Sequence, residues 1–337
     1  MSVSQKTLIP SSKVSRESQP SLRLVEFGPD NRPYLTSRAA VAVDASVPRI
    51  RHLVTLAKPE ITVMVMISSG LACVLASNTI QLVVLLNAML GTGLVAASAG
   101  VLNQYFECAL DARMRRTSKR PLPSGHVTTG EALILGLSLA AGGTIYLAFL
   151  VNVLIALVGF LTLVTYLFVY TPLKTRTALC TLIGAIPGAA PMLMGWAAAR
   201  NNLAPMAWAL YLILFLWQFP HFYAIGWLYR EDYARAGMKM LPAIDEQDGK
   251  TTFRRILIST KLLIVASLLF TLAAPASLLY LVLSLSLGLS FYYVAYRASL
   301  SRSKVAAKAL LHASVIYLPL LYLAMLLDKV YLSGSTN

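Results

Sequence analysis

Apolar residues dominate this chain in nine long runs that are separated by short polar segments. Each run is close to the length of about 20 residues that an α-helix needs to cross the hydrocarbon core of a bilayer. The pattern therefore predicts an all-α, polytopic membrane protein with nine transmembrane helices. The predicted spans cover residues 60–77, 81–108, 129–149, 151–170, 178–199, 206–229, 255–274, 276–296 and 309–328.

Residues near the predicted helix ends support several of these spans. Pro59 and Glu60 suit the first turn of the first helix, where proline loses no hydrogen bond and a negative charge meets the positive end of the helix dipole. Thr128 and Glu131 have the spacing of a capping box before the third span. The boundary between the seventh and eighth spans is the weakest, since only residues 274–276 separate them.

The first 50 residues differ from the rest of the chain. They are polar, serine-rich and basic, with prolines that prevent a long helix, so residues 1–50 are predicted to be a disordered extension. The membrane domain is expected over residues 51–330, followed by a short tail over 331–337. No apolar core of a secretory signal is present in the extension. A mitochondrial transit peptide is the alternative, but four acidic residues in the extension favour a bacterial protein.

Composition and charge exclude a soluble domain. Hydrophobic residues make up 57% of the chain and charged residues 13%, and the mean hydropathy is +0.67. The net charge of +15 would suggest nucleic acid in a soluble protein, but here the basic residues gather in the loops after the even-numbered spans. This bias predicts a cytoplasmic N-terminus in a cell inner membrane, or alternatively a mitochondrial one, and argues against a nucleic-acid partner.

A polar stretch, NQYFECALDARMRRTSKRPLPSG, follows the second apolar run. Asn103, Glu107 and Asp111 stand four residues apart, so they share one face of a helix and can bind a cation. Arg115 and Arg120 follow in a basic run that ends at prolines, which cannot continue the helix. Carboxylates beside guanidinium groups at a membrane surface predict binding of a metal-bound polyphosphate. The alternative is that the acidic residues are interfacial and simply pair with arginines.

A second acidic group, Glu231 and Asp232, follows the sixth span on the same predicted side of the membrane, with Lys239 nearby. Two such groups can hold Mg²⁺, which binds a few carboxylates and takes its other oxygens from water and phosphate. Arginine and lysine would neutralise the rest of a diphosphate. Lys174, which ends the fourth span, is either one of these cations or a lysine that snorkels to the interface.

The implied reaction is ionisation of an allylic diphosphate, whose carbocation aromatic rings can stabilise. The aromatic candidates, most of which we expect to be packing residues, are Tyr105, Phe106, Tyr166, Tyr170, Trp217, Phe222, Tyr223 and Trp227. His221 is a lone histidine in an apolar segment. Such a residue is more often hydrogen-bonded packing than a ligand, although imidazole is also the ligand that an iron porphyrin selects.

Four segments together resemble the UbiA-type intramembrane prenyltransferases. They are LAKPEIT (56–62), the stretch at 103–125, YTPLKTRTALCTLIGAIPGAAPMLMGW (170–196) and WQFPHFYAIGWLYREDYARAGMKMLP (217–242). The third and fourth are similar to the branch of the family that modifies haem. That resemblance implies a nine-helix bundle around a central cavity, which transfers farnesyl from farnesyl diphosphate to a vinyl group of haem b with addition of water. It also implies a haem A synthase as a candidate partner.

Carried over to this sequence, the resemblance implies residue roles. The implied catalytic and Mg²⁺-binding residues are Asn103, Glu107, Asp111 and Asp232, and the implied diphosphate contacts are Arg115, Arg120, Lys174 and Lys239. The resemblance gives no place to His221; this histidine, as a haem contact, and Tyr170 are further candidate substrate contacts. Two departures stand out. Glu107 occupies a position where the family often has Asp, and Asp232 lacks a second aspartate four residues away, so the number of metal ions stays open.

Two other functions remain open. Within the same chemistry, the acceptor could be an aromatic quinone precursor, against which the block at 170–196 argues. From another class, the chain could be a membrane transporter, but transporters place ionisable groups near the middle of the membrane. Here the charged residues gather at one face, which favours a diphosphate substrate.

Overall fold

The structure, a computed structural model, describes residues 48–273 and 277–335, and every regular element in these ranges is a helix. In chain order the elements are α1 (Arg49–Leu56), α2 (Pro59–Ala76), α3 (Leu82–Asp111), α4 (Thr129–Leu150), α5 (Val153–Val164), the π-helix η1 (Thr165–Tyr170), α6 (Thr171–Leu173), α7 (Cys180–Arg200), α8 (Pro205–Leu228), α9 (Arg230–Arg235), α10 (Leu241–Ile244), α11 (Lys250–Ala273), α12 (Leu278–Ser301) and α13 (Lys304–Ser335). The predicted extension over residues 1–50 lies outside the described residues except for its last positions.

Nine of the described helices are long and apolar enough to cross a bilayer, which confirms the nine predicted spans. The fourth span runs without interruption through α5, η1 and α6. The last three helices are longer than predicted, because α11 begins at Lys250, α12 continues to Ser301 and α13 continues to Ser335. The added turns contain polar and charged residues, which a hydropathy pattern excludes but a helix end at the interface tolerates. The weak boundary at 274–276 lies outside the described residues.

Both predicted helix starts are present. Pro59 is the first residue of α2, and Glu60 lies in its first turn. At α4, Thr128 Oγ1 accepts a hydrogen bond from Glu131 N at 3.2 Å, while Glu131 Oε2 accepts one from Thr128 N at 2.9 Å. These bonds satisfy two amide groups that the start of a helix leaves unpaired.

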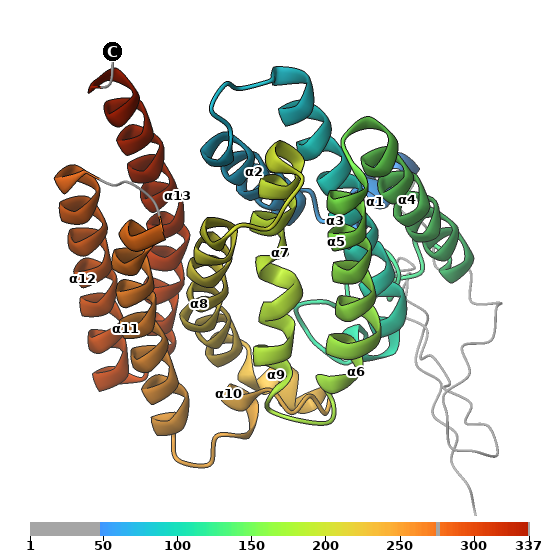
Figure 1. The fold of residues 1–337 in the computed structure, drawn as a ribbon. Coiled ribbons are helices and arrows are strands. Elements are labelled where there is room, and N and C mark those ends of the chain that lie inside the picture. The colour runs from blue at the N-terminus through green and yellow to red at the C-terminus, as the bar shows by residue number, and fades with distance from the viewer. Residues whose placement is uncertain (1–47, 274–276, 336–337) are drawn as a thin grey trace, which may run out of the picture. The chain divides into compact units, whose positions relative to one another are not determined.

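Helix α7 is the most buried span of the bundle (Figure 1). It packs against α2 and α8, and α8 packs in turn against α11 and α13. A side chain at Gly195 would place its Cβ 1.9 Å from the carbonyl oxygen of Ser69 in α2, so only glycine permits this close approach of the two backbones. Helix α3 contacts α2, α4, α7 and the fourth span, and its polar C-terminal residues Asn103, Glu107 and Asp111 are buried.

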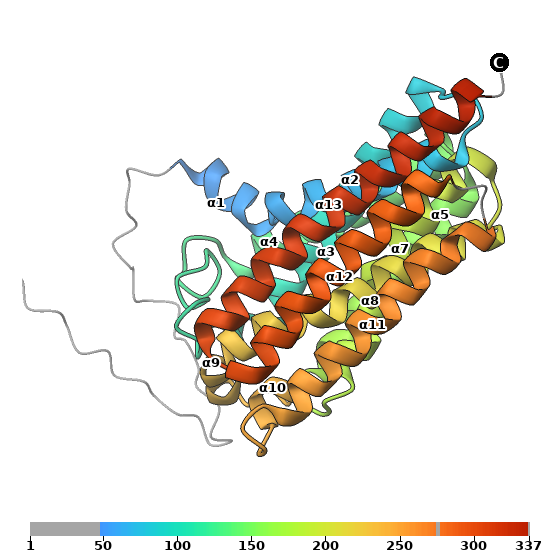
Figure 2. The same ribbon diagram turned by 90° about the vertical axis from the view of Figure 1, so that its left-hand side faces the viewer.

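The short helices α9 and α10 lie at the opposite end of the bundle from the end of α13 (Figures 1 and 2). Helix α3 also ends there, at Asp111. The loop after α3 contacts Asp232, so this end of α3 lies next to the segment that contains α9. We call the end that carries Glu107, Asp111 and Asp232 the acidic end. The fold thus brings together polar segments that lie more than 100 residues apart in the sequence.

Candidate active site

Asn103, Glu107 and Asp111 occupy successive turns of α3, as predicted, and they are only 2%, 5% and 1% exposed. Burying carboxylates is costly unless each meets a partner. A cation contacts each of these three side chains: Lys58 Nζ donates to Asn103 Oδ1 at 3.2 Å, Lys174 Nζ lies 2.7 Å from Glu107 Oε1, and Arg120 Nη1 donates to Asp111 Oδ2 at 2.7 Å. The predicted face is therefore a buried polar site and not a row of interfacial charges.

The loop after α3 folds back onto the end of this helix. Thr117 is fully buried, and its Oγ1 donates to the carbonyl oxygen of Asp111 at 2.9 Å. Arg120 follows three residues later, which brings its guanidinium group to the Asp111 carboxylate. Gly125 has φ +78°, a conformation that glycine adopts without steric cost, before the chain enters α4. The loop thereby holds one cation over the last carboxylate of α3.

A π-helical turn shapes the end of the fourth span. Pro172 has no backbone N–H, so it cannot form the α-helical hydrogen bond to Phe168. Instead, the backbone N–H of Thr171 donates to the carbonyl oxygen of Tyr166, and so does its hydroxyl, at 2.9 Å. The same hydroxyl accepts a hydrogen bond from Asn103 Nδ2 at 3.3 Å. The π-turn therefore joins the fourth span to the first residue of the polar face.

Lys174 is the most buried cation of the site, at 8% exposure. Its Nζ forms an ion pair with Glu107 and lies 4.6 Å from the centroid of the Tyr170 ring. Burial alone would lower the pKa of the Lys174 ammonium, but Tyr170 and Glu107 outweigh burial, and the pKa is raised. A snorkelling lysine would hold its charge in water. Lys174 instead keeps a protonated ammonium inside the acidic end.

Asp232 joins the acidic end through the basic loop. Its Oδ2 accepts a hydrogen bond from the backbone N–H of Arg116 at 3.2 Å, and its Oδ1 accepts one from Arg235 at 2.8 Å. Burial would raise the pKa of Asp232, but these donors outweigh it and lower the pKa. The backbone N–H of Lys239 donates to the carbonyl oxygen of Lys174 at 2.7 Å. The second acidic segment is thus hydrogen-bonded both to the loop after α3 and to the end of the fourth span.

The side chains of four residues singled out in the sequence do not contact the buried carboxylates. Glu231 points to the surface and pairs with Lys304 of α13 at 2.8 Å, because adjacent residues of a helix point about 100° apart. The side chains of Arg115 and Lys239 are exposed. His221 lies farther along α8, against α13.

Lys58 is a candidate to which the sequence patterns assign no role. It precedes Pro59 in LAKPEIT and adopts a left-handed backbone conformation with φ +49° at the start of α2. Burial, together with the nearby cations Arg120 and Lys174, lowers the pKa of Lys58 to about 7. The only sequence signal for Lys58 is its position directly before a helix-starting proline. That position does not indicate a site residue, because its partner Asn103 is 45 residues away in the chain.

The donor set of the acidic end suits a divalent cation that binds together with phosphate. Among the described residues, no three His, Cys, Asp or Glu side chains come close enough to hold a metal ion. Glu107 Oε1 is enclosed and, despite its ion pair, accepts no hydrogen bond. Mg²⁺ commonly binds one or two carboxylates and takes its remaining ligands from water and substrate phosphate. The residues present therefore fit Mg²⁺ that protein and phosphate hold jointly.

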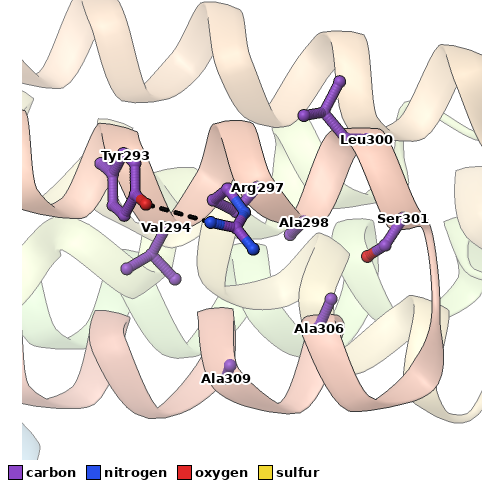
Figure 3. A pocket seen from close by; sticks show the side chains of 8 residues that line it. All are labelled: Tyr293, Val294, Arg297, Ala298, Leu300, Ser301, Ala306 and Ala309. Atoms are coloured by element: carbon purple, nitrogen blue, oxygen red, sulfur yellow. Dashed lines mark hydrogen bonds between the residues drawn. The ribbon is translucent and has the colours of Figure 1, made fainter.

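A separate hollow of about 860 Å³ lies between α12 and α13 (Figure 3). Its polar lining includes Arg297, which donates a hydrogen bond to the Tyr293 hydroxyl at 3.1 Å. None of the lining residues belongs to the charged cluster at the acidic end. We therefore place the candidate active site at the acidic end, where buried charges converge, and not in this hollow.

Residues 63–317 match the UbiA prenyltransferase family. The chain belongs to this family. A protein named protoheme IX farnesyltransferase from Solibacter usitatus is 46% identical to this UbiA prenyltransferase, over 83% of the chain and 99% of the relative. Another of the same name, from Koribacter versatilis, is 40% identical over 86% of the chain and 99% of the relative.

The fold of this UbiA prenyltransferase is also similar to solved structures. A structure of digeranylgeranylglyceryl phosphate synthase superposes with a TM-score of 0.70 at 19% identity, covering 84% of the chain and 99% of that protein. A UbiA homolog from Archaeoglobus fulgidus, bound to GPP and Mg²⁺, superposes with a TM-score of 0.60 at 14% identity, covering 81% and 99%. These similarities confirm the predicted all-α membrane fold.

Proposed function

We propose that this UbiA prenyltransferase transfers the farnesyl group of farnesyl diphosphate to a vinyl group of haem b, with addition of water, to give haem O and diphosphate. The names of the two relatives support both substrates. The convergence of Lys58, Lys174 and Arg120 on the buried polar face of α3, formed by Asn103, Glu107 and Asp111, carries the proposal. A set of paired charges at the end of an apolar bundle suits a diphosphate whose prenyl chain lies among the helices.

The residues of the acidic end divide into two proposed roles. The proposed Mg²⁺ ligands are the polar residues of both acidic motifs: Asn103, Glu107, Asp111 and Asp232. The proposed diphosphate ligands are the surrounding basic residues: Lys58, Arg115, Arg120, Lys174 and Lys239. When bound, Mg²⁺ supplies positive charge that favours departure of the diphosphate. Lys174 forms an ion pair with Glu107 and Arg120 forms one with Asp111, so diphosphate binding exchanges these ion pairs for contacts to phosphate.

The proposed transfer breaks the bond between farnesyl C1 and its diphosphate oxygen, and the electron pair leaves with diphosphate. The haem vinyl group then attacks C1, and water adds to the resulting porphyrin-side cation and releases a proton. The Tyr170 ring lies beneath the ammonium group of Lys174. Its π-face becomes available to the allylic cation when Lys174 turns to the phosphate.

We also propose that the acidic end faces the cytoplasm of a bacterial cell, with the chain in the cell membrane. The basic loops at this end satisfy the positive-inside rule, and both relatives are bacterial. In this orientation farnesyl diphosphate reaches the site from the cytoplasm. A haem A synthase in the same membrane is the proposed consumer of the product.

The proposed function is tested by turnover of the purified full chain with farnesyl diphosphate, Mg²⁺ and either haem b or 4-hydroxybenzoate, with products read by mass. We expect a farnesylated, hydrated haem whose formation stops with EDTA and returns with added Mg²⁺. Prenylated benzoate would move the acceptor to the quinone precursors. No metal-dependent product from either acceptor would contradict a prenyltransferase function.

A further inference from the structure

His221 is a polar residue of the bundle interior to which the proposed transfer chemistry gives no role. It lies in α8, eight residues before Tyr229, which corresponds to about 12 Å along the helix. The Tyr229 ring lies 4.9 Å beneath the guanidinium of Arg116, whose backbone N–H binds Asp232. The imidazole is therefore about two turns deeper in the bundle than the acidic end.

Ser314 of α13 determines which nitrogen of His221 carries the proton. The Ser314 hydroxyl donates its single proton to the carbonyl oxygen of Leu311 at 2.6 Å. His221 Nδ1 lies 2.8 Å from the same hydroxyl oxygen; with the Ser314 proton donated to the Leu311 carbonyl, Nδ1–H is the donor of that hydrogen bond. A neutral imidazole protonated at Nδ1 has its free lone pair on Nε2.

The plane of the imidazole ring is also held in place. The Trp217 ring stacks on it, with centroids 4.6 Å apart and an interplanar angle of 22°. Trp217 Nε1 donates to the carbonyl oxygen of Ser314 at 2.9 Å, so one residue of α13 anchors both rings. The direction of the Nε2 lone pair is therefore set before any ligand binds.

Nε2 of His221 has no hydrogen-bond partner among the described residues, and it is accessible. It is not among the buried side-chain atoms of the described residues that lack a hydrogen bond, which are His52 Nε2, Glu107 Oε1 and Thr181 Oγ1. A histidine with an accessible Nε2 lone pair and a donated Nδ1–H has the arrangement of metal-ligating histidines, in which the second hydrogen bond orients the ring.

We propose that His221 Nε2 is an axial ligand of the iron in the haem substrate. The inference rests on the proposed function, since the haem acceptor is the group that brings iron into the bundle. Coordination at this depth puts the iron about two helical turns from the acidic end, so that an edge vinyl group can be directed toward the diphosphate. Ser314 and Trp217 are positioning residues that act through the imidazole.

The test is a titration of the purified, detergent-solubilised full chain with ferric haem b, followed by absorption and resonance Raman spectroscopy. We expect a histidine-ligated spectrum for the unmodified chain. His221→Gln, whose amide can keep a hydrogen bond to Ser314, should lose this spectrum, and haem should bind at least about tenfold more weakly. In His221→Ala, added imidazole should restore the ligated spectrum. Ser314→Ala should keep the ligand but weaken haem binding by about tenfold.

His312→Ala is the matched control, because it removes an exposed imidazole from the adjoining helix and should leave the haem spectrum unchanged. A ligated spectrum that survives His221→Gln, or that disappears in His312→Ala instead, would overturn the inference. Asp111→Asn should lose farnesyl transfer but keep the ligated spectrum. If the unmodified chain makes farnesylated haem without a histidine-ligated spectrum, the ligand assignment fails alone. If it neither binds nor farnesylates haem, the proposed function fails with it.

Discussion

The two acidic motifs of this chain have similar residues but different architecture. Glu107 and Asp111 project from the last turns of the 30-residue helix α3, and both are buried. Glu231 and Asp232 belong to the six-residue helix α9, where Asp232 is bonded to the basic loop and Glu231 pairs with Lys304 at the surface. A spacing of four residues keeps two carboxylates on one helical face, whereas a spacing of one separates them.

The two motifs also differ in the contacts that hold their carboxylates in place. The carboxylates of α3 are held by a long helix that packs against α2, α4, α7 and the fourth span, and they form ion pairs with Lys174 and Arg120. Asp232 is held by the backbone of the loop after α3 and by Arg235. We therefore expect substitutions in the first motif to have the larger effect on turnover.

Asp111→Ala should cause the largest loss, about 10²- to 10³-fold in turnover, because it removes a proposed metal ligand and leaves Arg120 without its partner. The rate of farnesylated haem formation, read by mass, measures the effect. Asp111→Asn keeps the shape of the side chain and should lose almost as much. A fully active Asn variant would show that the charge of Asp111 is not needed.

In the second motif, Asp232→Asn should lower turnover by about 10²-fold, since it removes a carboxylate that faces the basic loop. Glu231→Gln is the matched control, because its ion pair with Lys304 is exposed. It should stay within about twofold of the unmodified chain. Equal losses in the same assay would show that the two carboxylates do not differ in the way that their contacts indicate.

Lys174→Ala should raise the KM for farnesyl diphosphate by about tenfold or more, because it removes a charged donor to the phosphate. The same change leaves Glu107 buried without its cation, which is also destabilising. The double variant Lys174→Met with Glu107→Gln carries no unpaired charge and should restore the unfolding temperature but not the KM. An unchanged KM in Lys174→Ala would return this residue to an interfacial role.

Gly184→Ala should have the smallest effect, a decrease in turnover of about two- to tenfold. A Cβ at Gly184 would lie 2.5 Å from Cε2 of Tyr170, so the ring must shift from its position beneath Lys174. Gly142→Ala is the control, because a Cβ there meets no neighbouring atom within 4 Å. Equal turnover in both variants would contradict a role for the position of the Tyr170 ring.

Features that depend on neighbouring residues could be predicted from the sequence. The nine spans follow from runs of apolar residues, and the capping box at Thr128 follows from one short pattern. The common face of Asn103, Glu107 and Asp111 follows from helical spacing. The sequence also predicts that carboxylates and cations form one site, because the acidic and the basic residues lie within one stretch of the chain.

The pairing of these groups was decided by tertiary structure. Lys58 reaches Asn103 because α2 packs on α3, and Lys174 reaches Glu107 because the fourth span ends in a π-turn. Contacts between distant segments also decide that Glu231 is exposed while Asp232 is buried. The same is true of the Ser314 hydroxyl that orients His221. The length of an apolar run and the helical period are properties of consecutive residues, so they can be found in the sequence. The partner of a buried charge or imidazole lies on a neighbouring helix, so it depends on how the helices pack.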